Sequence, residues 1–382
     1  MKWTLAPSIK PMARKQGWNY QTHQPEANLR FQVSKTSLAG FRDFIANAPE
    51  WMHLRDTDHT QGKRPPAAKP FGRLYSVSEY DIPESFSCEI PGALVIGREG
   101  LISNEHGEVL ADSFKTHGEI GARIALTRAQ PDLENIPSAL KGRYISLRAF
   151  ATDNYCHWLL DTMPRLGMLG LCLDDEVKFI LPSPLKSFHI DSLRAFGLTD
   201  SQWVNVESNV TAVEQLTFLV STPKPNRPHP AHLLAMTERI KHNILGDERP
   251  TPKRRIYVAR ANTTRLILNR DELLPVLDEF GFEVVYCERL TFEEQVRLFA
   301  ETQVILGAHG AGMCNHIFCP PESAVVELYH PLFWQDNVHR YSVFYRQPHW
   351  HLFGVPVDAG GIYNMVIDPE KLRDLLALIC AS

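Results

Sequence analysis

The chain has 382 residues, of which 44% are hydrophobic and 22% are charged, and its formal net charge is −4. This length exceeds what one hydrophobic core usually serves, so we expect two domains in a soluble globular protein. The small negative charge gives no argument for nucleic acid as a partner, and no apolar run is long enough to cross a bilayer.

The cysteines and the N-terminal residues indicate a cellular compartment. Seven cysteines without a Cys-x-x-Cys pair argue against a disulfide framework and against a structural zinc site, so we expect thiols in a reducing compartment. The first 15 residues carry Lys and Arg but lack the apolar core of a signal peptide. We therefore expect a cytoplasmic location.

The first 80 residues are weakly patterned, apart from 38–48, which favours a helix. The proline-rich segment 55–72 predicts a long loop. It contains Asp56-Thr57-Asp58, a spacing that can hold a divalent ion on phosphates. Because no strand precedes this tripeptide, we interpret it as a solvated loop and predict no metal site.

An antiparallel β-meander is predicted from three short strands, 93–97, 100–103 and 108–111. The turn at 104–107, between the last two strands, has Asn and Gly as turn residues. Further α/β elements follow, namely strands at 143–147, 179–181 and 215–220 and a helix at 187–196. These elements complete a predicted N-terminal domain over 1–221.

Polar side chains recur every four residues along a helix predicted over 153–166, and they are Asp153, His157, Asp161 and Arg165. Residues four apart lie on the same face of a helix, so these form one polar stripe. The remaining surface is rich in Trp, Leu and Met, which suggests burial on most sides. A polar stripe on a buried helix favours a functional site.

The same helix has a predicted cap and a predicted kink. Asp153 or Asn154 can cap its N-terminus. Pro164 has no N–H to donate to the carbonyl group one turn earlier, so we expect a kink there. The alternative to a functional stripe is an Asp161–Arg165 ion pair that stiffens the helix, with His157 as a satisfied core histidine.

Two proline-rich breaks, 221–231 and 248–253, flank a predicted helix over 232–245. We place a domain junction with a linking helix over 222–253. A C-terminal domain is predicted over 254–360. The last segment, 361–382, contains a helix predicted over 368–379 with an apolar stripe.

The C-terminal domain alternates strands with helices. The predicted strands are 255–259, 282–287, 304–307 and 323–328. Helices are predicted to begin at Asn269 and Thr291, each with a Glu three residues later, as in a capping box. Strands separated by helices of this length need crossover connections, which predicts a parallel sheet.

Polar and small residues follow the ends of these strands, and they are Arg260, Arg265, His309, Gly310, Ala311, Gly312 and Glu327. Ligands of open α/β sheets bind at the carboxyl ends of the strands. Guanidinium groups suit phosphates, a Gly-Ala-Gly turn lets backbone N–H groups approach an anion, and a carboxylate can accept from ribose hydroxyls. The pattern therefore predicts a site for a nucleotide diphosphate.

Each of these assignments has an alternative. Arg260 could form a surface pair with Glu288 instead of contacting phosphate. His309 could contact the phosphates or a donor sugar, hydrogen-bond a neighbouring loop, or cap the following helix. Glu327 could be an ordinary carboxylate at the end of a strand. Gly310 and Gly312 suit the geometry of the turn with or without a ligand.

Three runs of this sequence resemble the catalytic domain of glycosyltransferase family 61: HWLLD (157–161), NRDELLPVLDEFGFEVV (269–285) and GAHGAGMCNHIF (307–318). The resemblance adds Asn315 to the donor-binding residues. It implies the GT-B architecture, with two Rossmann-like domains facing a cleft and a last helix that crosses back to the N-terminal domain. Arg270 departs from the family pattern, where an acidic residue is expected, and we expect it on the solvent side of its helix.

The resemblance also implies a reaction, namely inverting transfer of a sugar from a nucleotide-diphosphate sugar, with UDP favoured, to a hydroxyl of an acceptor. Arg260, Arg265 and the N–H groups of the Gly-Ala-Gly turn would stabilise the leaving diphosphate, so no cofactor or divalent metal is expected. His157 or Asp161 would take the acceptor's proton, and spacing does not decide between them. Asn154 and Arg165 would support these two residues.

The family context implies the acceptor and its place in a bacterial cell. The acceptor is expected to be a glycan or a lipid-linked saccharide of capsule or lipopolysaccharide biosynthesis, with peripheral association at the inner face of the cytoplasmic membrane. A non-catalytic protein that binds or senses a nucleotide sugar is the alternative. A dehydrogenase is disfavoured because no Gly-x-Gly-x-x-Gly turn follows the first strand of the C-terminal domain.

Overall fold

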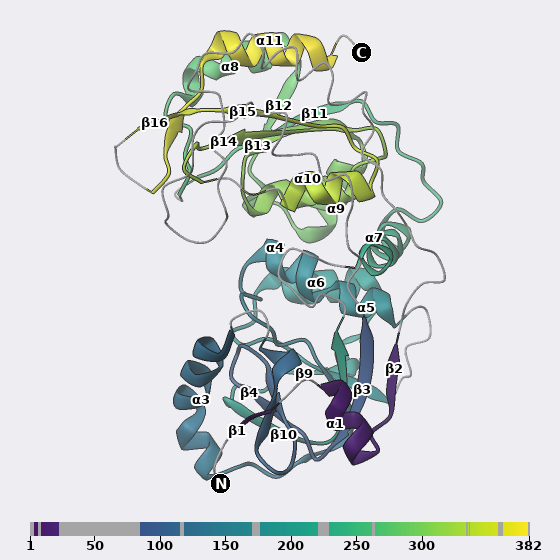
Figure 1. Ribbon diagram of the computed structural model, residues 1–382. Helices are drawn as coiled ribbons and strands as arrows, with labels where there is room; N and C mark the ends of the chain where they lie inside the picture. Colours follow the sequence, from purple (N-terminus) through teal and green to yellow (C-terminus); the bar gives the residue numbers. More distant parts are fainter. Residues whose placement is uncertain are drawn as a thin grey trace. The chain divides into compact units, whose positions relative to one another are not determined.

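The structure is a computed structural model that describes residues 4–6, 9–22, 85–114, 118–169, 176–220, 229–261, 264–333, 335, 337–357 and 362–380. The chain divides into two compact units, which are treated separately below (Figure 1). Of the described residues, those up to Gly246 form the first unit and those from Asp247 form the second. This division falls inside the junction predicted at 222–253. The helix expected over 38–48 and the Asp56-Thr57-Asp58 tripeptide lie outside the described residues.

The described strands of the first unit form one mixed sheet, and they are β1 (Thr4–Ala6), β2 (Tyr20–Thr22), β3 (Phe86–Pro91), β4 (Leu94–Ile96), β5 (Leu101–Ser103), β6 (Glu108–Leu110), β7 (Leu140–Ser146), β8 (Val177–Ile180), β9 (Trp203–Val204) and β10 (Val210–Val220). Strands β4, β5 and β6 are the predicted antiparallel meander. Strands β10, β7, β8 and β9 pair in parallel, in that order.

Strand β10 is central to this sheet because it is long enough to pair with three other strands. It is rich in Val, Thr, Leu and Phe, which favour strands, and both of its faces are largely buried. Its first residues pair antiparallel with β4, its later residues pair antiparallel with β3, and its other edge pairs in parallel with β7. The sequence predicted only its second half, 215–220.

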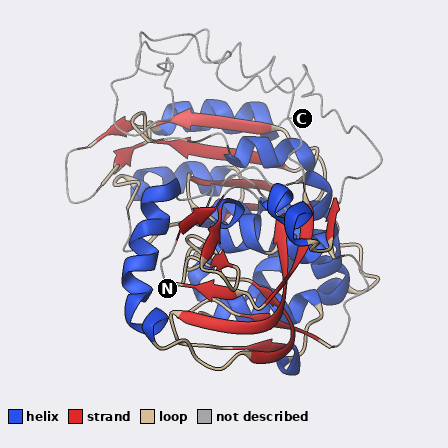
Figure 2. Ribbon diagram, turned by 60° about the horizontal axis from the view of Figure 1, so that its bottom comes forward, coloured by secondary structure: helices blue, strands red, loops and turns tan. Residues whose placement is uncertain are grey.

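The helices of the first unit are α1 (Ile9–Gln16), η3 (Ala111–Ser113), α3 (Gly118–Glu134), α4 (Tyr155–His157), η4 (Trp158–Thr162), α5 (Pro164–Met168), α6 (Ser187–Phe196), η5 (Asp200–Gln202) and α7 (Pro230–Leu245). Figure 2 shows the strands of the sheet in red with the long helix α3 beside them. Alanines of α3, with Leu133, pack against the meander. Helix α6 ends at Gly197, which has a left-handed conformation with a φ of 103°.

The second unit has three layers. Its strands are β11 (Arg254–Val258), β12 (Phe282–Val285), β13 (Thr302–Ala308), β14 (Ala324–Tyr329), β15 (His349–Phe353), β16 (Val355–Pro356) and β17 (Met365–Val366). The first five form an all-parallel sheet in the order β12-β11-β13-β14-β15, which confirms the predicted parallel α/β structure. β13 and β14 are buried almost throughout, as parallel strands covered on both faces must be.

The helices of this unit are α8 (Arg270–Glu279), η6 (Cys287–Arg289), α9 (Phe292–Ala300), η7 (Ala311–Phe318), α10 (Asn337–Phe344) and α11 (Pro369–Cys380). Figure 1 shows α8 and α11 on one face of the sheet and α9 and α10 on the other. Strand β15 and helix α10 were not predicted, because the segment that forms them lacks clear periodicity.

The last helix differs from its prediction. We expected α11 to cross back to the N-terminal domain. Its apolar stripe instead lies in the core of the second unit, and the residues are Leu372, Leu375, Leu376 and Ile379. The stripe is buried with Leu273, Val276 and Leu277 of α8, so α11 covers the sheet of its own unit.

The two predicted capping boxes have different outcomes. Thr291 and Glu294 cap α9 reciprocally, with the Glu294 N–H donating to Thr291 Oγ1 and the Thr291 N–H donating to Glu294 Oε2. Asn269 does not cap α8 with its side chain. Its amide nitrogen donates to Glu272 Oε2 and to the carbonyl oxygen of Ile367, and its oxygen accepts from the N–H of Ile367 and not from the helix N-terminus.

The cysteines also depart from expectation. Cys88, Cys287, Cys319 and Cys380 are free thiols. Cys156 and Cys314 are disulfide-bonded, so the prediction of thiols throughout is wrong. Sequence spacing could not reveal this, because disulfide formation depends on which side chains the fold brings together.

Candidate functional site

A cavity of about 320 Å³ opens at the carboxyl ends of β11 and β13. In chain order the sheet runs 2-1-3-4-5, so these two strands flank the point where the strand order reverses. Crevices at such switch points are where open α/β sheets bind ligands. Three arginines line this one, Arg260, Arg265 and Arg270, and we refer to it as the arginine cavity.

Arg260 follows β11 and is held by the backbone around it. Its Nε donates a hydrogen bond of 3.1 Å to the carbonyl oxygen of Thr264. Its guanidinium lies against Gly310, where a Cβ atom would be 1.8 Å from Nη1. Glycine is therefore required at position 310 to leave room for the guanidinium.

Arg265 has a left-handed backbone with a φ of 62°. Its guanidinium lies over the ring of Phe333, 4.8 Å from the ring centroid. The pKa of Arg265 is lowered to about 10, mainly by burial and then by the charge of Arg260, while the charge of Glu327 opposes the shift. The two guanidinium groups therefore repel each other in a partly buried site.

No ion pair joins Arg260 or Arg265 to a carboxylate among the described residues, and this includes the alternative pair of Arg260 with Glu288. Burial lowers the pKa of Arg260, and Glu288 opposes this only by its charge. Two half-buried cations that repel each other, and that have no ion-pair partner in the described part of the chain, favour binding of an anion.

Arg270 was discounted in the sequence as a solvent-facing departure from the family pattern, and this interpretation is wrong. It is the first residue of α8, and its side chain lines the arginine cavity. Nη1 donates a hydrogen bond of 2.6 Å to the hydroxyl of Tyr286. The cavity thus has a third guanidinium that the motif comparison did not predict.

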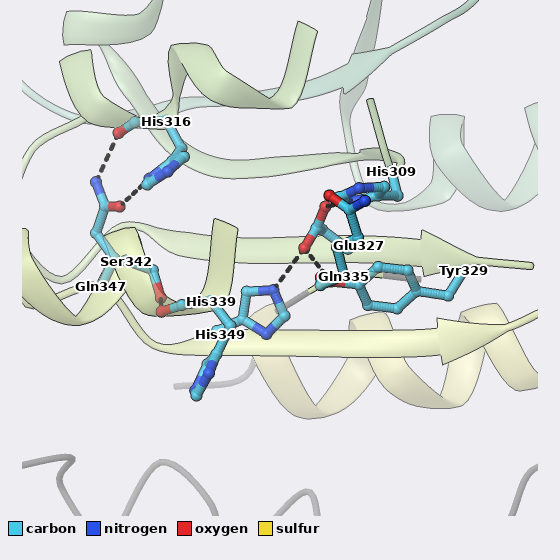
Figure 3. Close-up of polar contacts among 9 residues, drawn as sticks. All are labelled: His309, His316, Glu327, Tyr329, Gln335, His339, Ser342, Gln347 and His349. Carbon is cyan, nitrogen blue, oxygen red and sulfur yellow. Dashed lines mark hydrogen bonds and ion pairs between the residues drawn. The ribbon is translucent and has the colours of Figure 1, made fainter. Parts of the chain in front are cut away.

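Glu327 anchors a buried polar network under the same edge of the sheet (Figure 3). Its Oε1 lies 2.7 Å from Nδ1 of His309, and its Oε2 lies 3.0 Å from Nε2 of His349. The hydroxyl of Tyr329 also donates to Oε2. A carboxylate on Nδ1 leaves Nε2 as the nitrogen with which His309 can meet a ligand.

This arrangement does not match the expected contact of Glu327 with a ribose. The residue is completely buried, and His309, His349 and Tyr329 occupy both of its carboxylate oxygens. Burial alone raises the pKa of Glu327, but the charges and hydrogen bonds of the two histidines outweigh burial, so the pKa lies well below its usual range. Glu327 positions His309 instead.

The turn after β13 is also held from within the protein. Asn315 is buried, and its side-chain amide donates to Gln295 Oε1 at 2.8 Å. This hydrogen bond connects η7 to α9, so the Asn315 side chain is not presented to a ligand. A Cβ atom at Gly312 would be 2.8 Å from a methyl group of Val258, so this glycine allows close packing on β11. Ala311, the first residue of η7, is half-buried.

His157 and Asp161 form a hydrogen-bonded pair in the first unit, which we call the dyad. Nδ1 of His157 lies 2.8 Å from Oδ2 of Asp161, and the side chains are 27% and 15% exposed. The hydrogen bond that His157 donates to Asp161 is the main reason that the pKa of His157 is raised. Asn154 caps the helix as predicted, with Oδ1 accepting from the backbone N–H groups of Cys156 and His157.

The helix that carries the dyad is interrupted by the π-helical turn η4, where the N–H of Met163 donates to the carbonyl oxygen of Trp158. Pro164 begins the next helix and does not kink a continuous one. Because a π-turn spans one more residue than an α-turn, the polar stripe is not continued. Arg165 donates to the carbonyl oxygen of Ser146 at 3.2 Å, and burial lowers its pKa to about 10 against the opposing charge of Asp161.

No group of three or more His, Cys, Asp or Glu side chains among the described residues could hold a metal ion. None of the helices in the described ranges is both long and apolar enough to cross a membrane. The predictions about metal and location are therefore untested.

The family model for Glycosyltransferase 61 matches residues 155–326. This segment includes the dyad, Arg260, Arg265 and His309. Among curated proteins, the chain is 32% identical over 263 residues to the beta-1,2-xylosyltransferase XAX1 of Oryza sativa subsp. japonica, covering 62% of this chain and 45% of the relative.

Two other relatives match over shorter segments. The EGF domain-specific O-linked N-acetylglucosamine transferase of Drosophila melanogaster is 33% identical over 121 residues, covering 29% of this chain and 23% of the relative. The alpha-1,3-arabinosyltransferase XAT3 of Oryza sativa subsp. japonica is 30% identical over 138 residues, covering 34% and 22%. The chain thus spans less than half the length of these three relatives. The residues that carry the resemblance lie within the matched segment, and residues 155–326 of this chain are similar to glycosyltransferase family 61.

Proposed function

We propose that this protein is an inverting glycosyltransferase that takes a sugar from a nucleotide-diphosphate sugar, with UDP favoured as the nucleotide. The observation that supports this most is the pair Arg260 and Arg265, which have no ion-pair partner among the described residues and lie in a cavity at the switch point of a parallel sheet. A diphosphate supplies the negative charge that these two groups require. Both arginines lie in the segment matched by the family model.

In this proposal, the arginine cavity stabilises the departing diphosphate. As the glycosidic bond to the anomeric carbon breaks, its electron pair goes to the β-phosphate oxygen. Arg260 and Arg265 offer fixed positive charge for that oxygen, as preorganised electrostatic stabilisation. His309, oriented by Glu327, adds a donor through Nε2. These positive charges and this hydrogen-bond donor support transfer without a divalent metal.

The acceptor hydroxyl attacks the anomeric carbon from the face opposite to the leaving group, and its proton passes to a base. The sequence left His157 and Asp161 open as that base. The dyad geometry favours His157, because Asp161 contacts Nδ1 and so keeps Nε2 for the acceptor proton. Asp161 is then a positioning residue that also stabilises the imidazolium.

The proposal includes the GT-B architecture that the family resemblance implies, with the dyad in the first unit and the arginine cavity in the second. We propose a glycan or lipid-linked saccharide of bacterial capsule or lipopolysaccharide biosynthesis as acceptor, and a site of action at the inner face of the cytoplasmic membrane. The names of the three relatives specify three different transferred sugars, namely xylose, N-acetylglucosamine and arabinose. The family alone therefore does not select the donor sugar for this chain.

The test is slow hydrolysis of a panel of sugar nucleotides by the full chain in excess EDTA, followed as release of the free nucleotide diphosphate. The proposal predicts release from at least one donor, and loss of that release in the variant His157→Ala. Binding of a donor without hydrolysis or transfer would support the alternative, a protein that senses nucleotide sugars. Activity that EDTA abolishes would contradict metal independence.

A further inference from the structure

An aromatic pair lies beside the arginine cavity and has no role in the chemistry described above. The rings of Phe333 and Tyr363 are stacked, with centroids 4.9 Å apart and an interplanar angle of 29°. The guanidinium of Arg265 lies 4.8 Å from the centroid of the same Phe333 ring. Arg265 and Tyr363 therefore both pack on one phenyl ring, which places an aromatic surface next to a proposed phosphate ligand.

The backbone at both ends of this stack is strained. Arg265 has a φ of 62° and Tyr363 has a φ of 61°, which is unusual for residues with a side chain. Hydrogen bonds hold the two segments together, since the Arg265 N–H donates to the Ile362 carbonyl oxygen at 3.0 Å and the Leu266 N–H donates to Asn364 Oδ1 at 2.9 Å. Strain that the surrounding structure maintains is often found at ligand-binding sites.

The pair is not part of the hydrophobic core of the second unit. Neither Phe333 nor Tyr363 belongs to the cluster of buried side chains that α8 and α11 cover. Tyr363 is 37% exposed, and the neighbouring Ile362 is 64% exposed. An exposed ring that is supported by a second ring, on which the guanidinium of Arg265 also packs, has the chemistry of a stacking surface for a planar base.

We propose that Tyr363, supported by Phe333, stacks on the nucleobase of the nucleotide whose diphosphate binds Arg260 and Arg265. The inference rests on the proposed function, because it takes the arginine cavity as the diphosphate site. It extends that function by assigning a nucleoside subsite to residues outside the segment 155–326 that the family model matches. Stacking tolerates different bases, so Tyr363 contributes affinity and does not select the base.

Calorimetry of the full chain with UDP and with inorganic pyrophosphate tests this. Removal of one base–aromatic stack typically weakens binding by roughly tenfold or more. Tyr363→Ala should therefore raise the Kd for UDP at least tenfold and leave the Kd for pyrophosphate unchanged, whereas Tyr363→Phe should bind both ligands like the wild type. Leu378→Ala, which truncates an exposed leucine on α11, is the matched control and should change neither Kd.

The outcomes separate this inference from the proposed function. If the wild type binds neither ligand, the diphosphate site itself is wrong. If the wild type binds UDP and Tyr363→Ala binds it equally well, the stacking role is overturned. Equal losses for UDP and pyrophosphate would also overturn it, because Tyr363 would then only support Arg265. Should Tyr363→Ala fail to fold, Tyr363→Leu removes the ring while keeping apolar bulk, and the same expectations apply.

Discussion

Oε1 of Glu327 lies 2.7 Å from Nδ1 of His309, and this contact joins β14 to the residue that follows β13. The carboxylate is completely buried and also contacts His349. A strand-end carboxylate that the sequence suggested as a ligand for ribose thus orients the histidine that follows Ala308, a residue that lines the arginine cavity. The carboxylate also has a consequence for stability.

Glu327→Ala should destabilise the protein strongly, because it leaves His309 and His349 buried without their carboxylate. Breaking a buried pair of this kind costs about 3–5 kcal/mol in the free energy of unfolding. Glu283→Ala is the matched control, since Glu283 lies on β12 of the same sheet and pairs with Arg254 at the surface. Such a surface pair contributes below about 1 kcal/mol. Urea unfolding measures both, and similar losses would contradict the assigned role of Glu327.

The second unit should lose stability as the pH falls below about 6.5. Burial is the main cause that lowers the pKa of His316 to about 4 and that of His339 to about 3. The unfolded chain therefore binds protons in this range that the folded chain does not bind. Between its folded and its unfolded pKa, each histidine lowers the free energy of unfolding by about 1.4 kcal/mol for each unit by which the pH falls.

Urea unfolding at pH 7 and pH 5 measures this loss. His316→Gln should reduce the difference in unfolding free energy between the two pH values, because it removes one of the buried groups. His106→Gln is the control, since His106 lies in the exposed turn between β5 and β6. A difference that His316→Gln leaves unchanged would exclude His316 as a source of the acid sensitivity.

The dyad predicts a specific pH profile. Asp161 raises the pKa of His157 mainly through its hydrogen bond, so the base loses its proton only above the ordinary range for histidine. Donor turnover should therefore rise with pH through that raised pKa. Asp161→Asn should move the acidic limb of kcat/KM to lower pH and reduce kcat by about 10²-fold. If the acidic limb of kcat/KM does not move in Asp161→Asn while the affinity for the donor is unchanged, Asp161 does not position His157.

Gly310 offers a test of how Arg260 is placed. A methyl group at position 310 would collide with Nη1 of Arg260, so Gly310→Ala should displace the guanidinium. We expect the Kd for UDP to rise about as much as in Arg260→Ala. Because the two changes affect one interaction, the double variant should be no weaker than Arg260→Ala alone. Additive losses in calorimetry would indicate that Gly310 acts independently of Arg260.

The parallel sheet of the second unit could be predicted because its strands and helices have clear local signals. Short β-prone runs alternate with helical stripes, and the capping box of Thr291 and Glu294 marks the start of α9. The prediction was weaker where tertiary partners replace local ones. Asn269 hydrogen-bonds Ile367, which is 98 residues away in the chain, and no local pattern contains that information.

The sequence was enough to predict where the candidate site lies, but it predicted the contacts of the site residues less well. The ends of β11 and β13 fix where Arg260 and His309 lie, so strand periodicity was enough to place them at one edge. The partner of Glu327 in β15, His349, is 22 residues away in a strand that was not predicted. Arg270 was missed because a departure from a family motif was taken as solvent-facing, whereas its side chain lines the arginine cavity.

The most direct test of the central claim is the affinity of the Arg260→Ala variant for UDP, measured by calorimetry beside Arg254→Ala. The two residues lie at opposite ends of β11, and Arg254 forms surface ion pairs away from the arginine cavity. A charge-assisted hydrogen bond to phosphate is worth about 1.5–3 kcal/mol, which predicts a Kd raised by roughly ten- to 150-fold in Arg260→Ala. Arg254→Ala should bind like the wild type. Equal UDP affinity in the wild type and Arg260→Ala would contradict the diphosphate site.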